Sequence, residues 1–524
     1  MDPMTDLSVF RGRLWCGCFA VLIVLFCSPP HAAAQYDAAI GRWTAQDALD
    51  PPPSGAILFV GSSSIRRWEQ LALDFADYKV IQRGFGGAHF DHLNIYVNDI
   101  VLPYNPAAIV VWAGTNDIAG GGDGNEVFAD YQEFVATVHA AQPNVDIFYL
   151  GIMPTPGRFA NGPEEMIANN AIAGFAAGNP RLHYIDLPTP FWALNPPNDP
   201  AFTGLFVDSI HLNRQGYEFW TSIIRPDIEA VIAPNKVATA NPDTPPVGGR
   251  ILFDFGPSNP DDGDHTASPD ANGNHWNNWH PAEGGVAILA GEHLGNLVDA
   301  TGTATGIGLT ITGGFSSNGK LHGGLLAPVP GLLGDLAIGS ATQDYFYCSA
   351  DGQPGYGDDD LPGGFMIDRL DPGLAYDFRF FGSRTSAETR ATRYQVIGAN
   401  QATAVLMTSG TDIGHDGVYD GNDDTFASVA GIRPDAFGQI FVDLTLLLGS
   451  YAYVNAMDIV VRQPGDWDHD GEVNIADAVA FVGCLAGPNQ LPPITKCRIV
   501  FDFDFDYDVD LRDFAEFQSL FAAP

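Results

Sequence analysis

Basic residues are scarce in this chain of 524 residues. It has 24 Lys and Arg against 63 Asp and Glu, which gives a formal net charge of −39. A surface this acidic repels phosphate backbones, so nucleic-acid binding is excluded as a main activity. The excess of carboxylates is suited to calcium or to a salty environment, although solubility alone accounts for much of it.

Long apolar runs are also few. After residue 34 no stretch is long and apolar enough to cross a bilayer, so we expect no membrane span. Residues 1–34 are typical of a signal peptide, because Arg11 and Arg13 precede the apolar run 14–26 and small residues precede Gln35. We therefore expect a protein that is secreted, periplasmic or held at the cell surface.

Only six cysteines are present, and three of them lie in the predicted signal peptide. Export permits disulfides, and the short separation of Cys484 and Cys497 predicts a bond between them. In the chain-entropy model, a disulfide that closes so short a loop stabilises the folded state by about 3 kcal/mol. Cys348 is then left over, and we expect it to be buried and reduced.

The length predicts more than one domain. Residues 36–232 alternate helical patterns with short runs that are apolar on both faces, at 56–60, 79–81, 108–112, 147–150 and 183–185. This alternation predicts a parallel sheet between two helix layers, with its chemistry at the carboxyl ends of the strands. Asn213 should cap the last helix, and Pro226 should kink or interrupt it.

Composition changes after a Pro-rich linker at 233–249. Residues 250–463 are rich in Gly, with short alternating runs and no helical period, which predicts a β-sandwich. Residues 464–524 form a third unit with two similar halves. The chain is thus expected to be multidomain: α/β, then β-sandwich, then a small loop–helix repeat unit.

Three residues of the first domain have the chemistry of a nucleophilic relay. Ser63 follows an apolar run in Gly61-Ser62-Ser63-Ser64, where a hydroxyl can point into the crevice at the strand end. A serine needs a base within reach, and the base needs an orienting acceptor. Asp208 and His211 are three residues apart, so one loop can present both. Each motif alone is equally consistent with an ordinary turn.

Gly87 and Asn116 complete the set. A tetrahedral intermediate needs preorganised donors for its oxyanion. The backbone amides of Ser63 and Gly87 and the side-chain amide of Asn116 can supply three of them, although Gly-Gly and Asn-Asp are also common loop residues.

Together the segments 57–65, 84–87, 110–116 and 208–212 resemble the four blocks of SGNH/GDSL-type hydrolases. They are most similar to the branch of the platelet-activating-factor acetylhydrolase catalytic subunits and many bacterial carbohydrate esterases. The resemblance implies a flavodoxin-like α/β/α sandwich, Ser63 as nucleophile, Gly87 and Asn116 as oxyanion donors, and Asp208 and His211 as triad partners. One departure is that Ser62 stands where the family has Asp, which leaves Ser62, Ser63 and Ser64 as candidates, with Ser63 favoured by the alignment.

The third unit has oxygen ligands at calcium-loop spacing. The first loop offers side chains at positions 1, 3, 5, 9 and 12 and the carbonyl of position 7, and the second repeats it: Asp466, Asp468, Asp470, Glu472, Asn474 and Asp477, then Asp502, Asp504, Asp506, Asp508, Asp510 and Asp513. Tyr507 replaces the turning Gly471, so the second loop is expected to be strained or to bind more weakly. Without calcium the clustered carboxylates repel, and we expect the unit to be loose.

Both loops end in Asp and resemble dockerin-type repeats. The resemblance implies structural Ca²⁺ and a cohesin-like protein partner. In the middle domain, segments 254–256 and 453–456 resemble galactose-binding-like β-sandwich modules. The Trp276 and Trp279 faces in the segment 274–279 could bind sugar, but core tryptophans are the stronger interpretation.

The sequence therefore predicts a secreted serine esterase that removes O-acyl groups, above all acetyl, from carbohydrate without a catalytic cofactor. Two alternatives stay open. The same site could hydrolyse lipid esters or thioesters, because nothing in the sequence determines the acyl pocket. The chain could also be a non-catalytic polysaccharide-binding or assembly protein.

Overall fold

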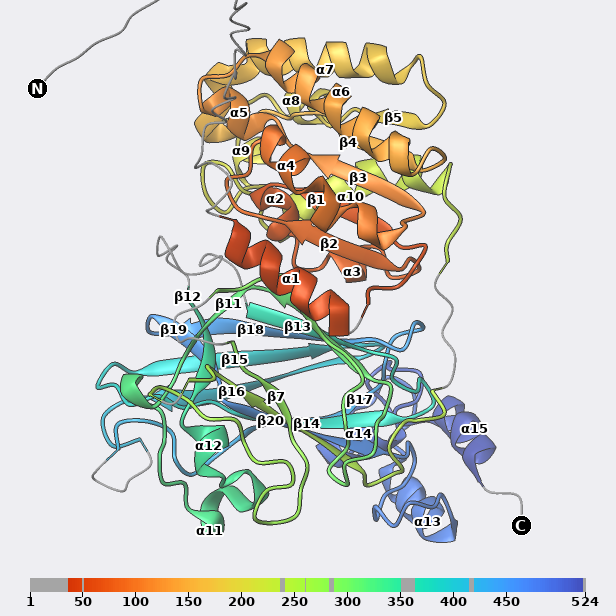
Figure 1. Ribbon diagram of the computed structural model, residues 1–524. Helices are drawn as coiled ribbons and strands as arrows, with labels where there is room; N and C mark the ends of the chain where they lie inside the picture. Colours follow the sequence, from red (N-terminus) through yellow and green to blue (C-terminus); the bar gives the residue numbers. More distant parts are fainter. Residues whose placement is uncertain are drawn as a thin grey trace, which may run out of the picture.

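The computed structural model describes residues 36–49, 51–235, 241–259, 261–281, 287–349, 363–413 and 419–521. The predicted signal peptide and residues 236–240 of the predicted linker lie outside them. We refer to residues 36–235 as the α/β domain, 241–462 as the β-rich region and 463–521 as the C-terminal unit. The α/β domain is at the top of Figure 1, and the C-terminal unit is at the lower right.

The α/β domain is built on one parallel sheet with strand order β2-β1-β3-β4-β5. The strands are β1 (Ile57–Gly61), β2 (Val80–Gly84), β3 (Ala108–Trp112), β4 (Asp146–Leu150) and β5 (Leu182–Ile185). Central β1 pairs Ile57 with Val80 on one side and Ala108 on the other. This is the order of flavodoxin-like sheets, so the predicted strands and their parallel arrangement are confirmed.

Helices cover both faces of this sheet because the strands are apolar on both faces. One layer packs α1 (Asp37–Leu49), α4 (Phe90–Ile100), α5 (Thr115–Ala119), α6 (Gly124–Ala141) and α7 (Gly162–Ala176). The other packs α2 (Ser63–Arg66), α3 (Leu71–Asp74), α8 (Pro188–Trp192), α9 (Pro200–Thr203) and α10 (Arg214–Glu229). The two 3-10 turns are η1 (Leu102–Tyr104) and η2 (Pro156–Asn161).

Helix α10 corrects one prediction. Asn213 caps it as expected, accepting a hydrogen bond from the N–H of Gly216 at 3.0 Å. Pro226, however, lies inside the helix and does not end it. Ile224 and Ile228 on either side of the proline are both fully buried, and their burial compensates the one backbone hydrogen bond that proline removes.

The β-rich region consists of three sheets. Their orders are β16-β15-β18-β13-β10-β9, β19-β12-β11-β8 and β17-β14-β20-β6-β7. The strands are β6 (Arg250–Phe255), β7 (Asn277–Trp279), β8 (Ala287–Ile288), β9 (His293–Leu294), β10 (Gly308–Gly313), β11 (Phe315–Asn318), β12 (Tyr345–Ser349), β13 (Gly363–Asp368), β14 (Ala375–Phe381), β15 (Arg390–Ile397), β16 (Gln401–Ser409), β17 (Ala427–Ile432), β18 (Ile440–Leu448), β19 (Tyr451–Val454) and β20 (Ala456–Arg462). Short helical turns connect them at η3 (Lys320–His322), α11 (Pro330–Leu333), η4 (Gly334–Leu336) and α12 (Gly339–Thr342).

The three sheets share one apolar core. The predicted change from α/β to β-rich structure is therefore confirmed. Trp276 and Trp279 are 3% and 7% exposed, so their faces belong to the interior and do not present a sugar-binding surface. Cys348 is buried and free, as predicted.

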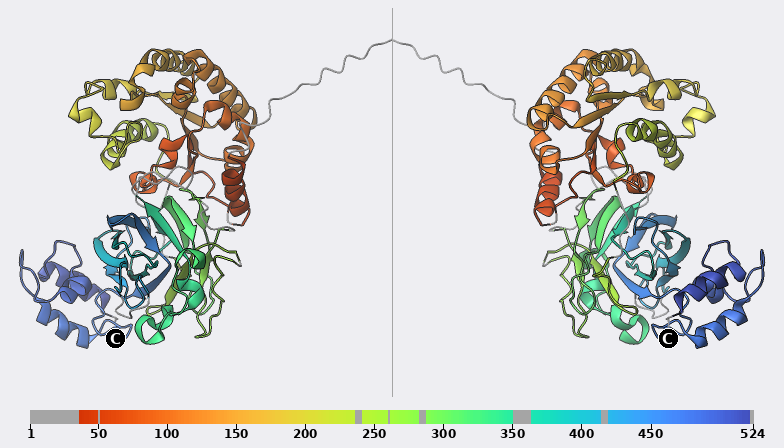
Figure 2. Two further views of the ribbon diagram at one scale, coloured as in Figure 1. Left: turned by 90° about the vertical axis from the view of Figure 1, so that its left-hand side faces the viewer. Right: turned by 90° about the vertical axis from the view of Figure 1, so that its right-hand side faces the viewer.

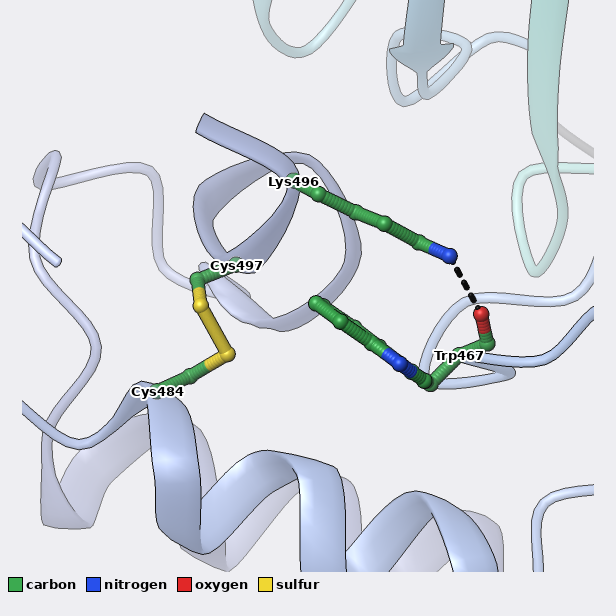
Figure 3. The surroundings of a disulfide bond; sticks show 4 residues. All are labelled: Trp467, Cys484, Lys496 and Cys497. Atoms are coloured by element: carbon green, nitrogen blue, oxygen red, sulfur yellow. Dashed lines mark hydrogen bonds between the residues drawn. A yellow bond between two sulfur atoms is a disulfide. The ribbon is translucent and has the colours of Figure 1, made fainter. Parts of the chain in front are cut away.

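The C-terminal unit has three short helices, α13 (Ile475–Cys484), α14 (Thr495–Phe501) and α15 (Leu511–Leu520). Figure 3 shows the predicted disulfide between Cys484 at the end of α13 and Cys497 in α14. Beside it the Lys496 ammonium donates to the carbonyl oxygen of Trp467 at 2.6 Å. A core of aromatic and apolar side chains joins the helices.

The α/β domain and the β-rich region touch directly, and α1 runs down to the strands below it (Figures 1 and 2). Arg42 of α1 forms an ion pair with Glu292 at 3.2 Å. Gln70, just before α3, donates to Asp443 of β18 at 3.1 Å. A cavity of about 560 Å³ lies between the two parts and has Arg83 and Arg369 in its lining. Among the described residues, no helix is long and apolar enough to cross a membrane.

Candidate active site

The turn after β1 presents Ser63. Gly61 ends the strand against β3, where a Cβ would lie 2.1 Å from the carbonyl oxygen of Trp112, so no other residue fits there. The chain then enters the single turn of α2, and the three neighbouring serines separate. Ser62 and Ser64 are 1% and 5% exposed, whereas Ser63 is half-buried. Of the three candidate nucleophiles, only Ser63 contacts a base.

That base is His211. Its Nε2 lies 2.9 Å from the Ser63 Oγ, and its Nδ1 lies 2.7 Å from Asp208 Oδ2. A carboxylate can only accept, so Nδ1 carries a proton and Nε2 is free to accept from the serine hydroxyl. The structure thus connects the three residues in the order Ser63, His211, Asp208.

The Asp208 carboxylate is held in its charged form. Its other oxygen accepts the backbone N–H groups of Ile210 and His211 at 2.5 and 2.7 Å. Burial alone would raise the pKa of Asp208, but the hydrogen bonds from the His211 ring and from these two amides hold it well below its usual value. The carboxylate therefore stays ionised and fixes the imidazole tautomer.

Two arginines missed by the sequence analysis lie beside this relay. The Arg67 guanidinium is 3.4 Å from Asp208 Oδ2 and only 4% exposed. It lies four residues after Ser63, a helical spacing that offered a weak signal. Arg158 donates to Thr115 Oγ1 at 3.2 Å. Burial lowers the pKa of Arg158, and the nearby charges of Glu165 and Asp208 oppose that shift. Nothing in the spacing of Arg158 pointed to the site.

The loop that contains Arg158 also supports the loop that contains His211. The backbone N–H of Gly157 donates to the carbonyl oxygen of Ser209 at 2.6 Å. A Cβ on Gly157 would lie 2.8 Å from the Ser209 hydroxyl oxygen. The close backbone contact therefore requires glycine and holds the Asp208–His211 loop in place.

Gly87 and Asn116 are brought together by hydrogen bonds between their segments. Asn116 donates through Nδ2 to the carbonyl oxygen of Ala88 at 2.8 Å, and Asp117 accepts the N–H of Phe90 at 2.8 Å. Ala88 directly follows Gly87, which is exposed and has the left-handed φ of +72° that favours glycine. In the described part of the chain, the backbone N–H groups of Ser63 and Gly87 donate to no protein group. They remain available for a bound oxyanion.

The two acidic loops of the C-terminal unit have the same backbone geometry, 36 residues apart. Asp477 and Asp513 each accept a backbone N–H near the start of their loop at 2.6 Å, from Trp467 and Phe503. Gly471 and Tyr507 both have left-handed φ angles, +89° and +74°. Tyr507 therefore takes the conformation for which the first loop uses glycine, with the steric cost of a side chain there.

Carboxylates gather in both loops as the spacing predicted. Asp466, Asp468 and Asp477 bring one oxygen each within 4.8 Å of one another, and so do Asp502, Asp504 and Asp513. Asp508 and Asp510 form a further group with Asp513. In the first loop Asn474 donates through Nδ2 to Asp470 Oδ2 at 3.4 Å. The backbone N–H groups of Glu472 and Asp508 donate to Asp470 and Asp506.

The chemistry of the second loop fits a cation. The Oδ1 atoms of Asp502 and Asp508 are buried without a hydrogen-bond partner. Burial, together with the charge of Asp513, raises the pKa of Asp502 to about 6. Clustered carboxylates with unused oxygens are the donor set that Ca²⁺ prefers.

A family model supports the interpretation of the α/β domain. The GDSL-like lipase/acylhydrolase family matches residues 39–219. No curated protein matches the chain.

Solved structures are similar to about a third of the chain. A GDSL-like lipase from Bacteroides thetaiotaomicron is 18% identical, with 37% of this chain and 99% of that chain covered and a TM-score of 0.32. An acetyl xylan esterase is 24% identical, with 34% of this chain and 99% of that chain covered and a TM-score of 0.29. A carbohydrate esterase family 3 protein from Talaromyces cellulolyticus is 18% identical, with 33% of this chain and 96% of that chain covered and a TM-score of 0.28. From the family match and the geometry of its site, the chain contains a GDSL-like lipase/acylhydrolase domain and is a carboxylic ester hydrolase.

Proposed function

We propose that this chain is an exported serine esterase that removes O-acetyl groups from carbohydrate. The observation that carries the proposal is the connected relay of Ser63, His211 and Asp208, with contacts of 2.9 and 2.7 Å, beside free amide donors. Ester hydrolysis by such a relay needs no cofactor, because the side chains supply the nucleophile, the base and the charge stabilisation.

The reaction runs in two steps. Ser63 Oγ attacks the ester carbonyl while His211 Nε2 takes its proton, and the oxyanion receives hydrogen bonds from the amides of Ser63, Gly87 and Asn116. The intermediate collapses when His211 returns the proton to the departing sugar hydroxyl, which leaves acetyl-Ser63. Water, deprotonated by His211, then attacks the acyl group, and acetate leaves as Ser63 recovers its proton.

Carbohydrate is favoured over lipid by the surroundings of the relay. The Asp208 side chain is 33% exposed, and Gly87 lies at the surface, so a bulky polar group can reach the serine. Next to Arg158, the Phe159 ring meets the 38% exposed Trp192 ring at a centroid distance of 5.3 Å. A half-exposed tryptophan offers an apolar face with a polar edge, which suits a sugar ring.

A panel of acetylated glycans, short-chain esters and long-chain lipid esters, scored for released acid, tests the proposal. We expect release of acetate from glycans, and a loss of about 10⁴-fold or more in kcat for Ser63→Ala. Ser64→Ala is the matched control, because Tyr217 donates to the backbone carbonyl of Ser64, which the variant keeps. Equal rates for Ser63→Ala and wild type would show that the relay takes no part in hydrolysis. Preference for long-chain lipids would favour the lipase alternative, and inactivity on every ester would favour a binding role.

We also infer that the C-terminal unit binds structural Ca²⁺ through the two acidic loops. Support comes from their repeated geometry and from the unused oxygens of Asp502 and Asp508. Calcium titration of the chelated full chain should show two equivalents bound. A chain that gains no heat of binding and no thermal stability with calcium would contradict this.

The exposed apolar side chains of α13, Ile475, Val479 and Val482, support a docking role for this unit. We propose a cohesin-like protein partner. Binding to such a module should be lost in Val479→Asp, and equal binding by the wild type and this variant would contradict the proposal.

We also propose export, on the basis of residues 1–34. N-terminal sequencing of the mature protein should then give Gln35 as its first residue.

A further inference from the structure

Three ionisable side chains meet inside the β-rich region, far from the acidic loops in the sequence. Asp254 lies on β6, His280 follows β7 and Asp344 precedes β12. All three side chains are fully buried, with 0% exposure. The His280 Nε2 is 3.0 Å from Asp254 Oδ2, and the three residues bring one ligand atom each within 4.8 Å of one another.

The carboxylate oxygens in this cluster are unsatisfied. Both oxygens of Asp344 and Oδ1 of Asp254 are buried and accept no hydrogen bond of good geometry from the described residues, although the backbone N–H of Asp264 lies near enough to lower the pKa of Asp344 in part. Asp254 Oδ2 accepts the backbone N–H of Thr266 at 3.0 Å and also lies 3.0 Å from His280 Nε2. A buried carboxylate without partners is costly, and two side by side are more so. Burial and the charge of Asp254 accordingly raise the pKa of Asp344.

Burial lowers the pKa of His280, but the Asp254 carboxylate and the bond to the Pro257 carbonyl raise it above its usual value. Nδ1 lies 3.0 Å from the carbonyl oxygen of Pro257, which can only accept, so Nδ1 carries a proton. Nε2 makes no hydrogen bond of acceptable geometry, although Asp254 Oδ2 is only 3.0 Å away. When Nε2 is deprotonated, its lone pair lies beside a carboxylate oxygen, which is the arrangement of two ligands of one metal ion. Two ligands about 2.1 Å from an ion and about 90° apart are separated by about 3.0 Å.

The backbone is packed tightly around Asp344. A Cβ on Gly256 would lie 2.4 Å from Asp344 Cγ, and one on Gly263 would lie 2.4 Å from its Oδ2. The carboxylate is thus enclosed by glycine backbone on two sides and cannot turn out to solvent. The neighbouring charged groups are Asp262, Asp264 and His265, whose ring centroid is 4.7 Å from that of His280.

We propose that Asp254, Asp344 and His280 bind one divalent transition-metal ion, Zn²⁺ or Mn²⁺. The two carboxylates neutralise the ion. The imidazole favours these metals over Ca²⁺, and the Nδ1–H bond to a backbone carbonyl orients the ring as it does in other metal sites. Strands β6 and β12 belong to different sheets, so the ion clamps two of the three sheets of the β-rich region together.

Metal binding by the full chain tests this. The protein is stripped with a chelator, returned to buffer with excess Ca²⁺ to fill the acidic loops, and titrated with ZnCl₂ or MnCl₂ in a calorimeter. We expect one equivalent bound and a rise in Tm of about 5 °C or more. In His280→Gln this equivalent should bind at least 100-fold more weakly. The matched control is His265→Gln, the neighbouring histidine outside the ligand set, which should bind like wild type.

Two results would overturn the proposal. Wild type could bind no more Zn²⁺ or Mn²⁺ than His280→Gln, or the added ions could leave the Tm of the stripped wild type unchanged. Either would mean that the cluster is a protonated histidine between carboxylates. If His280→Gln does not fold, the wild-type titration and Tm decide alone. Hydrolysis of a short-chain ester should be equal in stripped and metal-loaded protein, which separates this result from the esterase proposal.

Discussion

Two of the sites where histidine meets aspartate have opposite surroundings. In the α/β domain the Asp208 side chain is 33% exposed, and its oxygens accept from His211 and two backbone amides. In the β-rich region the Asp344 side chain is 0% exposed, and neither of its oxygens accepts a hydrogen bond of good geometry from the described residues. The same residue types thus have opposite pKa shifts, downward for Asp208 and upward for Asp344. Chemistry is decided by the partners and burial of each carboxylate, and the residue type alone does not decide it.

The largest effect should come from exchanging a carboxylate for an amide in each pair. Asp208→Asn should lower kcat by about 10³ to 10⁴, because the amide no longer fixes the His211 tautomer or stabilises its positive charge. Asp254→Asn should leave kcat unchanged and lower the Tm. Steady-state kinetics of both variants measure the effect on kcat, and thermal denaturation measures the effect on Tm. The comparison breaks if Asp254→Asn slows the enzyme as much as Asp208→Asn does.

The donors beside the relay come next. Asn116→Ala removes one proposed oxyanion donor and the bond to Ala88, and kcat should fall by about 10² to 10³ with little change in KM. Asn94→Ala is the control, because Asn94 also uses its amide for one bond to a backbone carbonyl, that of Asp130. A loss confined to KM would show that Asn116 binds the ground state and does not stabilise the transition state.

Glu165 is an intermediate case, buried like Asp344 but close to the charge of Arg158. Burial raises the pKa of Glu165 to about 8, against the opposing charge of Arg158. The folded state therefore holds the Glu165 proton more tightly than the unfolded state does. The resulting gain in the free energy of unfolding is complete below about pH 4.5 and is lost as the pH rises to about 8. Glu165→Gln should remove about 3 kcal/mol of this pH dependence from the free energy of unfolding. Urea denaturation at pH 5 and pH 8 compares the two proteins, and parallel pH profiles would contradict the assignment.

The smallest effect concerns the turn of the second acidic loop. Tyr507→Gly should relieve a left-handed φ and stabilise the calcium-loaded unit by about 1 kcal/mol, partly offset by loss of the Arg498 contact with the tyrosine ring. Gly471→Ala is the mirror experiment and should destabilise the first loop by a similar amount. Calcium affinity measured for each variant tests both, and an unchanged affinity in Gly471→Ala would show that the turn does not control binding.

The sequence was sufficient for the sheet and for the proposed relay because both follow local rules. Apolar runs of five residues mark parallel strands, and their ends mark the site. Only the resemblance to the family favoured Ser63 over Ser62 and Ser64, because the residues alone do not show which hydroxyl the turn of α2 leaves half-exposed. The continuous helix through Pro226 depends on burial that only the packed domain provides.

The cluster of Asp254, His280 and Asp344 was not predictable in the same way. These residues are 26 and 64 positions apart and follow no ligand spacing. They meet because β7 pairs with β6 in parallel and because Asp344, just before β12 of another sheet, packs against Gly256 just after β6. Contacts created by long-range strand pairing leave no periodic trace in the sequence.

The contact between the α/β domain and the β-rich region has a mechanical consequence. Arg42 and Gln70 reach the β-rich region from opposite sides of the parallel sheet. Two separated anchor points prevent the hinge motion that a single tether would permit. The serine therefore keeps one position and one orientation relative to the β-rich region.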